Sequence, residues 1–334
     1  MFKLKPKTLL VVKNRAMGDS IIGLSTLQYL RDILPNTHII YAVPSWIKPL
    51  YDDVETAADE IIELNLKTIS DFPKLWTNLK QYKIDTVFEL FQSGRTQKFF
   101  SLWQNLGGPQ YVAHNHHHQK GPVFDQGVIK SNIQRDMDGA WTFFDDTNGK
   151  PNSYLDYAPQ MKLESASKKQ IVLGVVATRK TKMWPLVNYI ELITKLLDSY
   201  PDYEIIIPLG PSDQDIEKSL RSVQSPRCKI IKEPLSRLPK LLAGSKLYIG
   251  NDTGLKHICI ALGIKSYTLF GPEPPLEWHP YNTKEHSYYF REPLECRTIT
   301  AHYCGLSTCE SMICLNTFTA DDLLEKVKNH LPSQ

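Results

Sequence analysis

Short apolar runs alternate with amphipathic stretches along most of the chain. In the first part, runs typical of buried strands occupy residues 8–12, 38–43, 61–64 and 86–90. Helical patterns lie between these runs, and the clearest is an apolar stripe that ends near Pro35. Strands that alternate with helices in this way predict parallel βαβ units and a doubly wound sheet.

The same alternation starts again at Gln170. Strand-like runs occupy residues 171–176, 204–209, 229–231, 247–249 and 266–270. The segment between the two parts, residues 114–168, is polar and shows one short helical pattern at 134–144. We interpret it as a long insert and place the domain boundary near residue 160. The fold class predicted is therefore α/β, with two Rossmann-like domains, residues 1–160 and 161–334, facing a central cleft.

Composition limits the possible functions. A chain of 334 residues is long enough for two domains with a core each, and 42% apolar and 22% charged residues are typical of a globular protein. A net charge of +3 gives no case for nucleic acid as a partner. We find no apolar run of membrane-spanning length and no signal peptide, and the six cysteines favour a reducing cytosol. The expected location is cytoplasmic.

One stretch, residues 246–272, combines a strand, a polar turn, a helix and a second strand. The turn is Asn251-Asp252-Thr253-Gly254, and Gly263 is placed to end the helix. Free amides at a helix N-terminus bind anions, and Lys256 and His257 in the first helical turn add donors. The alternative is that Asp252 or Thr253 only caps the helix.

The run GNDTGLKHICIALG followed by LFGP resembles the C-terminal signature of glycosyltransferase family 9, the ADP-heptose:lipopolysaccharide heptosyltransferases. That signature contains D-[ST]-G-x-x-H and an FGP strand end. The resemblance implies a donor-diphosphate site made of Asp252, Thr253, Gly254, Leu255 and His257. Lys256 stands where many relatives have a small residue, and it either contacts phosphate or faces solvent.

The first strand-to-helix turn, residues 13–19, lacks both the G-x-G-x-x-G and the P-loop fingerprints. Asp19 either caps the following helix or acts as a general base at the sheet edge. The run VVKNRAMGDS is similar to the family motif [KR]-x-x-[SA]-[ML]-G-D. This resemblance implies that Asp19 is the catalytic base and that Lys13 approaches the phosphates of the donor or the acceptor.

The run VVATRKTKMWP places several cations after a buried strand. They either form a solvated loop or neutralise a diphosphate. The family pattern T-x-x-x-K-x-W-P implies that Lys182 binds the donor phosphates and assists catalysis, with Thr178 beside it. No role follows for Arg179 or Lys180. After the next strand, Asp213 either bonds a ribose hydroxyl or caps a helix.

Other polar clusters are less specific. Arg95 and Lys98 share one helix face at i, i+3 spacing, and they either bind an anionic acceptor or face solvent. His114 and His116–His118 resemble a metal tract superficially, although a surface loop suits them better. The spacing of Cys296, Cys304, Cys309 and Cys314 does not match common zinc ribbons. Packing, metal binding and a disulfide remain open for them, in that order.

The resemblance covers both domains and implies the GT-B fold, with an N-terminal acceptor domain and a C-terminal donor domain. It implies an inverting, metal-independent transfer of heptose from ADP-heptose to a sugar hydroxyl of the lipopolysaccharide inner core. The expected acceptor is an anionic glycolipid, a lipid A–Kdo-like core, reached by peripheral contact with the inner membrane leaflet. No cofactor is expected besides the donor. The alternatives are a transferase with another nucleotide sugar or a protein acceptor, and a non-catalytic nucleotide-sugar binding module.

Overall fold

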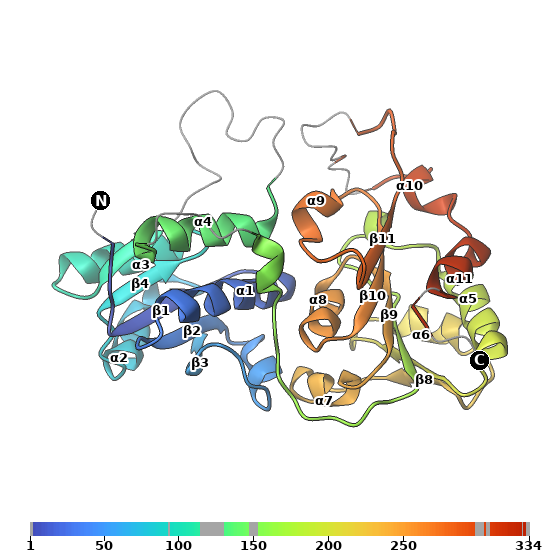
Figure 1. The fold of residues 1–334 in the computed structure, drawn as a ribbon, viewed down its shortest axis with the longest axis horizontal. Coiled ribbons are helices and arrows are strands. Elements are labelled where there is room, and N and C mark those ends of the chain that lie inside the picture. The colour runs from blue at the N-terminus through green and yellow to red at the C-terminus, as the bar shows by residue number, and fades with distance from the viewer. Residues whose placement is uncertain are drawn as a thin grey trace. The chain divides into compact units, whose positions relative to one another are not determined.

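The computed structural model describes residues 3–92, 94–113, 130–146, 153–297, 304, 308–328 and 330–331. These residues form two compact units, and the chain passes from the first to the second after Lys162. Each unit contains one all-parallel sheet with helices between its strands (Figure 1). The predicted α/β class with two doubly wound domains is confirmed, whereas a cleft between the domains stays a prediction.

The first unit is built on a five-stranded sheet with the strand order β3-β2-β1-β4-β5. Its elements are β1 (Thr8–Val12), α1 (Met17–Ile33), β2 (His38–Pro44), β3 (Glu60–Leu64), α2 (Phe72–Lys80), β4 (Thr86–Glu89), α3 (Gly94–Asn105), β5 (Gln110–Ala113) and α4 (Asn132–Phe144). Short 3₁₀ turns are η1 (Lys48–Tyr51), η2 (Ile69–Asp71) and η3 (Tyr154–Tyr157).

The central strand of this sheet is apolar because it is covered on both faces. Four of the five residues of β1 are fully buried. On one face, α2 and α3 contribute Leu75, Leu79, Phe99 and Phe100 to the core. Elsewhere α1 and α4 pack against each other, and the ring of Phe144 lies 5.3 Å from that of Phe88 on β4. The sheet is thereby held at the centre of the unit.

The second unit is built on a six-stranded sheet with the order β11-β10-β9-β6-β7-β8. Its strands are β6 (Gln170–Gly174), β7 (Glu204–Pro208), β8 (Cys228–Ile231), β9 (Leu247–Asn251), β10 (Lys265–Phe270) and β11 (His286–Phe290). Its helices are α5 (Leu186–Ser199), α6 (Gln214–Leu220), α7 (Leu238–Leu242), α8 (Gly254–Ala261), α9 (Pro275–Trp278), α10 (Ile313–Asn316) and α11 (Ala320–Lys328), with 3₁₀ turns η4 (Lys180–Lys182) and η5 (Leu235–Arg237).

The apolar stripe of α5 carries the core of this unit. Leu192, Ile193 and Leu196 are buried against strand residues such as Ile249 and against Leu323 of α11. Gly263 follows α8 with φ = +75°, the left-handed conformation that glycine adopts most readily at the end of a helix. The predicted helix end is confirmed. No helix in the described ranges is both long and apolar enough to cross a membrane.

Two features differ from the sequence prediction. β5 and β11 were not anticipated, because both are short and only partly buried and therefore lack a clear apolar run. The short helix predicted at 134–144 exists as α4, and it packs against α1, a contact that the sequence did not predict. Its polar residues Arg135, Asp136 and Asp138 are buried. The interpretation of residues 114–168 as an insert stays a prediction.

Candidate functional site

Each sheet has one place where the direction of strand addition reverses. In the first unit β2 and β3 lie on one side of β1, and β4 and β5 lie on the other. In the second unit β7 and β8 lie on one side of β6, and β9 to β11 lie on the other. Open parallel sheets bind ligands at such switch points, outside the carboxyl ends of the strands. The candidate sites are therefore the β1/β4 edge and the β6/β9 edge.

The ends of β6 and β9 approach each other closely. Gly174 and Gly250 are paired in register, and a Cβ on Gly250 would lie 2.5 Å from the Gly174 carbonyl oxygen. The buried Asn251 then joins the two connections. Its Oδ1 accepts a hydrogen bond from the Trp184 amide at 2.9 Å, and its Nδ2 donates to the Val175 carbonyl at 3.0 Å. The loop after β6 is thus fixed beside the turn after β9.

Two lysines share the carboxylate of Asp252 in that turn. Lys182 Nζ lies 2.7 Å from Asp252 Oδ2, and Lys256 Nζ lies 2.6 Å from Oδ1. The side chains of Lys256 and Asp252 are 0% and 5% exposed, whereas 16% of the Lys182 side chain is exposed. Two ammonium groups against one carboxylate leave one positive charge in surplus. Lys182 is the member of the group that an anion from solvent reaches most easily.

The pKa values in this group follow from burial and from the mutual charges. Burial alone would raise the pKa of Asp252, but Lys256 and Lys182 outweigh it and hold that pKa below its ordinary value. Burial lowers the pKa of Lys256 to about 8, against the opposing effect of Asp252. Asp252 is therefore ionised at neutral pH, and Lys256 is protonated below a pH of about 8.

The helix α8 begins two residues after Asp252, so its N-terminus lies next to this group in the chain. Thr253 is the N-cap residue, but its side chain makes no capping hydrogen bond, and Gly254 begins the helix. The oxygens of Asp252 are taken by the lysines. The alternative that Asp252 or Thr253 only caps the helix is therefore wrong, because neither side chain makes a capping hydrogen bond. Amides in the first turn have no helical acceptor, and the helix dipole favours an anion there.

His257 completes the predicted turn and is buried. Its Nδ1 lies 2.5 Å from the hydroxyl oxygen of Tyr281. Burial, assisted by the charge of Lys256, lowers the pKa of His257 well below its ordinary value, so the ring is neutral at neutral pH. Tyr281 was missed at the sequence level. It lies in an irregular segment between α9 and β11, and only the fold brings it to α8.

The other cations of the β6 loop have different surroundings. Arg179 forms an ion pair with Glu273, which follows the end of β10. This gives Arg179 a structural partner that the sequence did not assign. Thr178 and Lys180 are exposed, and their side chains make no hydrogen bond or ion pair with the described residues.

Asp213 is the N-cap residue of α6, but its side chain makes no capping hydrogen bond. Its Oδ2 accepts a hydrogen bond from the Gly210 amide at 2.7 Å, which closes the turn after β7. The carboxylate is partly exposed. A ribose contact for Asp213 stays a prediction.

Asp19 lies at the β1/β4 edge of the first unit. The N-cap residue of α1 is Ala16, so Asp19 is the third residue of the helix and the N-cap alternative is wrong. Its carboxylate is partly exposed and makes no hydrogen bond or ion pair within the described part of the chain. Such a carboxylate is available to accept a proton from a bound hydroxyl.

Lys13, predicted to approach phosphate, is instead buried against α4. Its Nζ lies 2.6 Å from Asp136 Oδ2, and the two side chains are 4% and 1% exposed. Burial raises the pKa of Asp136 against the effect of Lys13, and the charge of Asp19 raises it further. Asp136 was also missed at the sequence level. The available signal in the sequence was a charged residue, Asp136, among the apolar positions of the predicted 134–144 helix.

The predicted acceptor residues lie on α3, which follows β4. Arg95 and Lys98 are both exposed, and Arg95 donates a hydrogen bond to the Lys67 carbonyl. At the same edge the guanidinium of Arg15 lies 4.0 Å from the ring centroid of Phe91. Acceptor binding by Arg95 and Lys98 stays a prediction.

The cysteines are unpaired, and Cys314 packs against the core of the second unit. Within the described ranges, no three or more His, Cys, Asp or Glu side chains are grouped to hold a metal ion. The described residues therefore give no support to the metal alternative for Cys296, Cys304, Cys309 and Cys314. His114 and His116–His118 lie outside the described residues.

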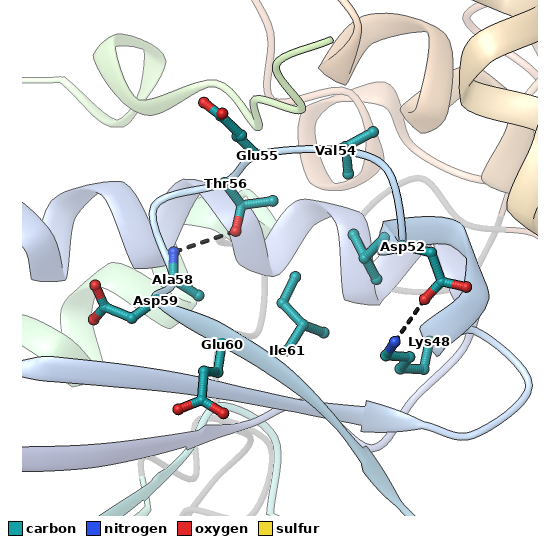
Figure 2. Close-up of a pocket in the computed structure, with 10 residues that line it drawn as sticks. Lys48, Asp52, Val54, Glu55, Thr56, Ala58, Asp59, Glu60 and Ile61 are labelled. Atoms are coloured by element: carbon teal, nitrogen blue, oxygen red, sulfur yellow. Dashed lines mark hydrogen bonds and ion pairs between the residues drawn. The ribbon is translucent and has the colours of Figure 1, made fainter.

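A separate cavity of about 380 Å³ lies in the first unit (Figure 2). Its lining comes from one continuous segment, residues 48–61, between η1 and β3. Two of its carboxylates are already paired, Asp52 with Lys48 and Asp59 with Arg31. None of the predicted site residues lines it, so this cavity is not the candidate site.

The family model of glycosyltransferase family 9 (heptosyltransferase) matches residues 133–303, slightly more than half of the chain. Lipopolysaccharide heptosyltransferase 1 of Escherichia coli K12 is 31% identical over 131 residues. That alignment covers 38% of this chain and 40% of the relative, so less than half of the relative's length is matched.

Solved structures show a similar fold over nearly the whole chain. The structure of E. coli ADP-heptose lps heptosyltransferase II has a TM-score of 0.72 and 19% identity, covering 96% of this chain and 97% of the other. The E. coli heptosyltransferase WaaC with ADP has a TM-score of 0.67 and 17% identity, covering 97% and 100%. At 19% and 17% identity, this structural similarity shows a shared fold and not a shared activity.

Proposed function

Because the chain belongs to glycosyltransferase family 9, we propose that it moves a heptose from ADP-heptose to a sugar hydroxyl of the lipopolysaccharide inner core, with inversion at the anomeric carbon. The names of its relatives support this proposal, since one is a lipopolysaccharide heptosyltransferase and a structural neighbour was solved with ADP.

The observation that carries the proposal is the charge arrangement at the β6/β9 edge. Lys182 is held 2.7 Å from Asp252, which lies two residues before the start of α8. The first backbone amides of a helix have no acceptor within the helix. A nucleotide sugar carries its negative charge on the diphosphate. One surplus positive charge, a helix N-terminus and a partly exposed ammonium group form a suitable site for that anion.

In the proposed reaction Asp19 removes the proton from the acceptor hydroxyl. The resulting oxygen nucleophile attacks the anomeric carbon of the donor, the bond from that carbon to the phosphate oxygen breaks, and ADP leaves with the electron pair. Lys182 and the amides of Thr253, Gly254 and Leu255 stabilise the charge that develops on the leaving diphosphate. The mechanism requires that the donor site and Asp19 meet, with water excluded.

His257 contributes a directed donor in this scheme. Its ring is neutral, and the pKa of Tyr281 is raised by burial, so the phenol keeps its proton. When Tyr281 donates to Nδ1, the ring proton resides on Nε2. Nε2–H then serves as a neutral hydrogen-bond donor to a phosphate oxygen.

The acceptor side is proposed on charge alone. The exposed Arg95 and Lys98 would bind an anionic sugar or phosphate of a lipid A–Kdo-like core. Since such an acceptor is held in a bilayer, the protein would act on the cytoplasmic side, in peripheral contact with the inner membrane leaflet. Thr178, Asp213 and Lys13 remain proposed donor contacts.

The proposal is tested by calorimetry with ADP, UDP, GDP and CMP, on the parent protein and on Lys182→Ala. We expect ADP to bind most tightly and Lys182→Ala to weaken it by about tenfold or more, because a partly buried charge-assisted contact is lost. Lys180→Ala is the matched control, since Lys180 is an exposed lysine of the same 3₁₀ turn.

A preference for another nucleotide would overturn the ADP-heptose donor. If Lys182→Ala and Lys180→Ala lose ADP affinity equally, general positive charge, and not the Lys182–Asp252 geometry, holds the nucleotide. Binding of ADP without transfer to any lipopolysaccharide acceptor would favour the non-catalytic alternative.

A further inference from the structure

Lys256 is a lysine with no exposed side-chain surface, in the first turn of α8. A buried ammonium group is costly unless it is paired and hydrogen-bonded. Its Nζ donates to Asp252 Oδ1 at 2.6 Å and to the Trp278 carbonyl at 2.8 Å. It also lies 4.8 Å from the centroid of the Phe270 ring. The nitrogen is thus contacted by the turn after β9, by α9 and by β10.

The titratable and charged groups around Lys256 come from every neighbouring element. They are Asp252 of the β9 turn, Lys182 of η4, His257 of its own helix, His279 and Tyr281 after α9, and His286 of β11. Burial lowers the pKa values of His257, His279 and His286, and it raises that of Tyr281. Lys256 is therefore the group here whose charge changes just above neutral pH.

We propose that Lys256 is a positioning residue that neutralises Asp252 from its buried side. The charge of Lys182, which lies against the other carboxylate oxygen, then remains available to the diphosphate of the substrate. The proposal rests on the proposed function, because it concerns the same anion site. It adds a role for a residue that does not itself touch the ligand.

Charge balance around Asp252 decides how much of the Lys182 charge an incoming anion meets. Asp252 holds Lys182 in place, but a carboxylate 2.7 Å away also cancels most of the ammonium charge seen by an incoming anion. Lys256 supplies a second positive charge on the buried side, at the opposite oxygen of the same carboxylate. The group of three then keeps the positional benefit of Asp252 and carries a net charge of one.

The test measures binding of ADP and of inorganic pyrophosphate by calorimetry at pH 7.5. Lys256→Met keeps an unbranched side chain in the space and removes the charge. We expect it to weaken both ligands by about tenfold or more, because the remaining Lys182–Asp252 pair is neutral. The double variant Lys256→Met with Asp252→Asn should recover most of that loss, since Lys182 alone again gives a net charge of one.

This recovery separates charge balance from structure. If Lys256 only supported packing, removing a second partner from the same network would weaken binding further. Thermal unfolding of all variants identifies loss of fold. If Lys256→Met does not fold, the pH dependence of the parent protein decides the question without any substitution.

Between pH 7.5 and 9.5 we expect the affinity of the parent protein for ADP, whose phosphates keep their charge over this range, to fall, because Lys256 loses its proton as the pH rises through its lowered pKa. The fall begins near the pKa of Lys256 in the free protein, about 8, and it ends at the higher pKa that Lys256 has when an anion is bound. The fall should be absent in Lys256→Met.

The outcomes separate this inference from the proposed function. Unchanged pyrophosphate affinity in Lys256→Met, no recovery in the double variant, or a flat pH profile in the parent protein would each overturn the role of Lys256. A parent protein that binds neither ligand would overturn both proposals. Charge-dependent pyrophosphate binding without heptosyl transfer would overturn the proposed function and leave the role of Lys256 standing.

Discussion

Both units place a buried lysine–aspartate contact at the switch point of a parallel sheet, but they balance its charge differently. In the first unit Lys13 and Asp136 form a pair of one cation and one carboxylate. In the second, Lys182 and Lys256 share Asp252. The balanced pair joins the turn after β1 to α4, and nearby Asp19 has no hydrogen-bond or ion-pair partner among the described residues. The unbalanced group instead presents positive charge. The number of cations for each carboxylate distinguishes an edge suited to proton removal from one suited to anion binding.

The largest effect should come from the Asp19 carboxylate of the first unit. Asp19→Asn keeps the shape of the side chain and removes its ability to accept a proton. We expect turnover to fall by roughly 10²- to 10⁴-fold, the usual contribution of a general base. The affinity for ADP should be unchanged, because Asp19 is not among the proposed donor contacts. Transfer rates at saturating donor and calorimetry with ADP measure the two quantities.

Asp32→Asn is the control for this variant, since Asp32 is an exposed aspartate of the same helix. Equal losses of turnover in both variants would contradict the role of Asp19 as the base. A parallel loss of ADP affinity in Asp19→Asn would instead assign Asp19 to the donor site.

A second prediction converts the balanced pair into an unbalanced one. Asp136→Asn leaves Lys13 buried without its counter-charge, so the free energy of unfolding of the first unit should fall by roughly 3–5 kcal/mol. The double variant Lys13→Met with Asp136→Leu removes both charges, so its free energy of unfolding should fall less than that of Asp136→Asn. Urea unfolding, followed by fluorescence of the tryptophans in the first unit, measures the difference.

Lys13→Met also separates two roles for Lys13. As a structural partner of Asp136 it affects stability, and as a donor contact it would also affect ADP affinity. An ADP affinity that falls while the free energy of unfolding does not change would contradict the pairing with Asp136 as the main role of Lys13.

The smallest effect is expected on the exposed face of α3. Arg95→Ala with Lys98→Ala should raise the KM for the acceptor by roughly three- to tenfold without changing kcat, since exposed ionic contacts contribute about 1 kcal/mol or less each. The increase should diminish at high salt. Lys74→Ala, an exposed lysine on α2, is the control. Equal KM values in all three proteins would remove Arg95 and Lys98 from the acceptor site.

Local sequence was enough to locate the edges of the sheets. Strands such as Thr8–Val12 were predicted at their observed bounds, because strands buried on both faces are continuous apolar runs. The turns at Asp19 and Asp252 were found because each is a short polar break between an apolar strand and a helical pattern. The strands β5 and β11 were not found, because strands that are only partly buried do not need a continuous apolar run.

The sequence by itself determined the α/β class, the two domains and the turns that hold Asp19, Lys182 and Asp252, because these depend on the order of residues within single βαβ units. Only the tertiary structure decided how those residues are paired. Lys13 meets Asp136 across 123 positions of the chain through the packing of α4 on α1. Lys256 loses all its exposure where β9, β10 and α9 meet around α8. Burial and pairing set the charge of each site, and both depend on contacts between segments far apart in the chain.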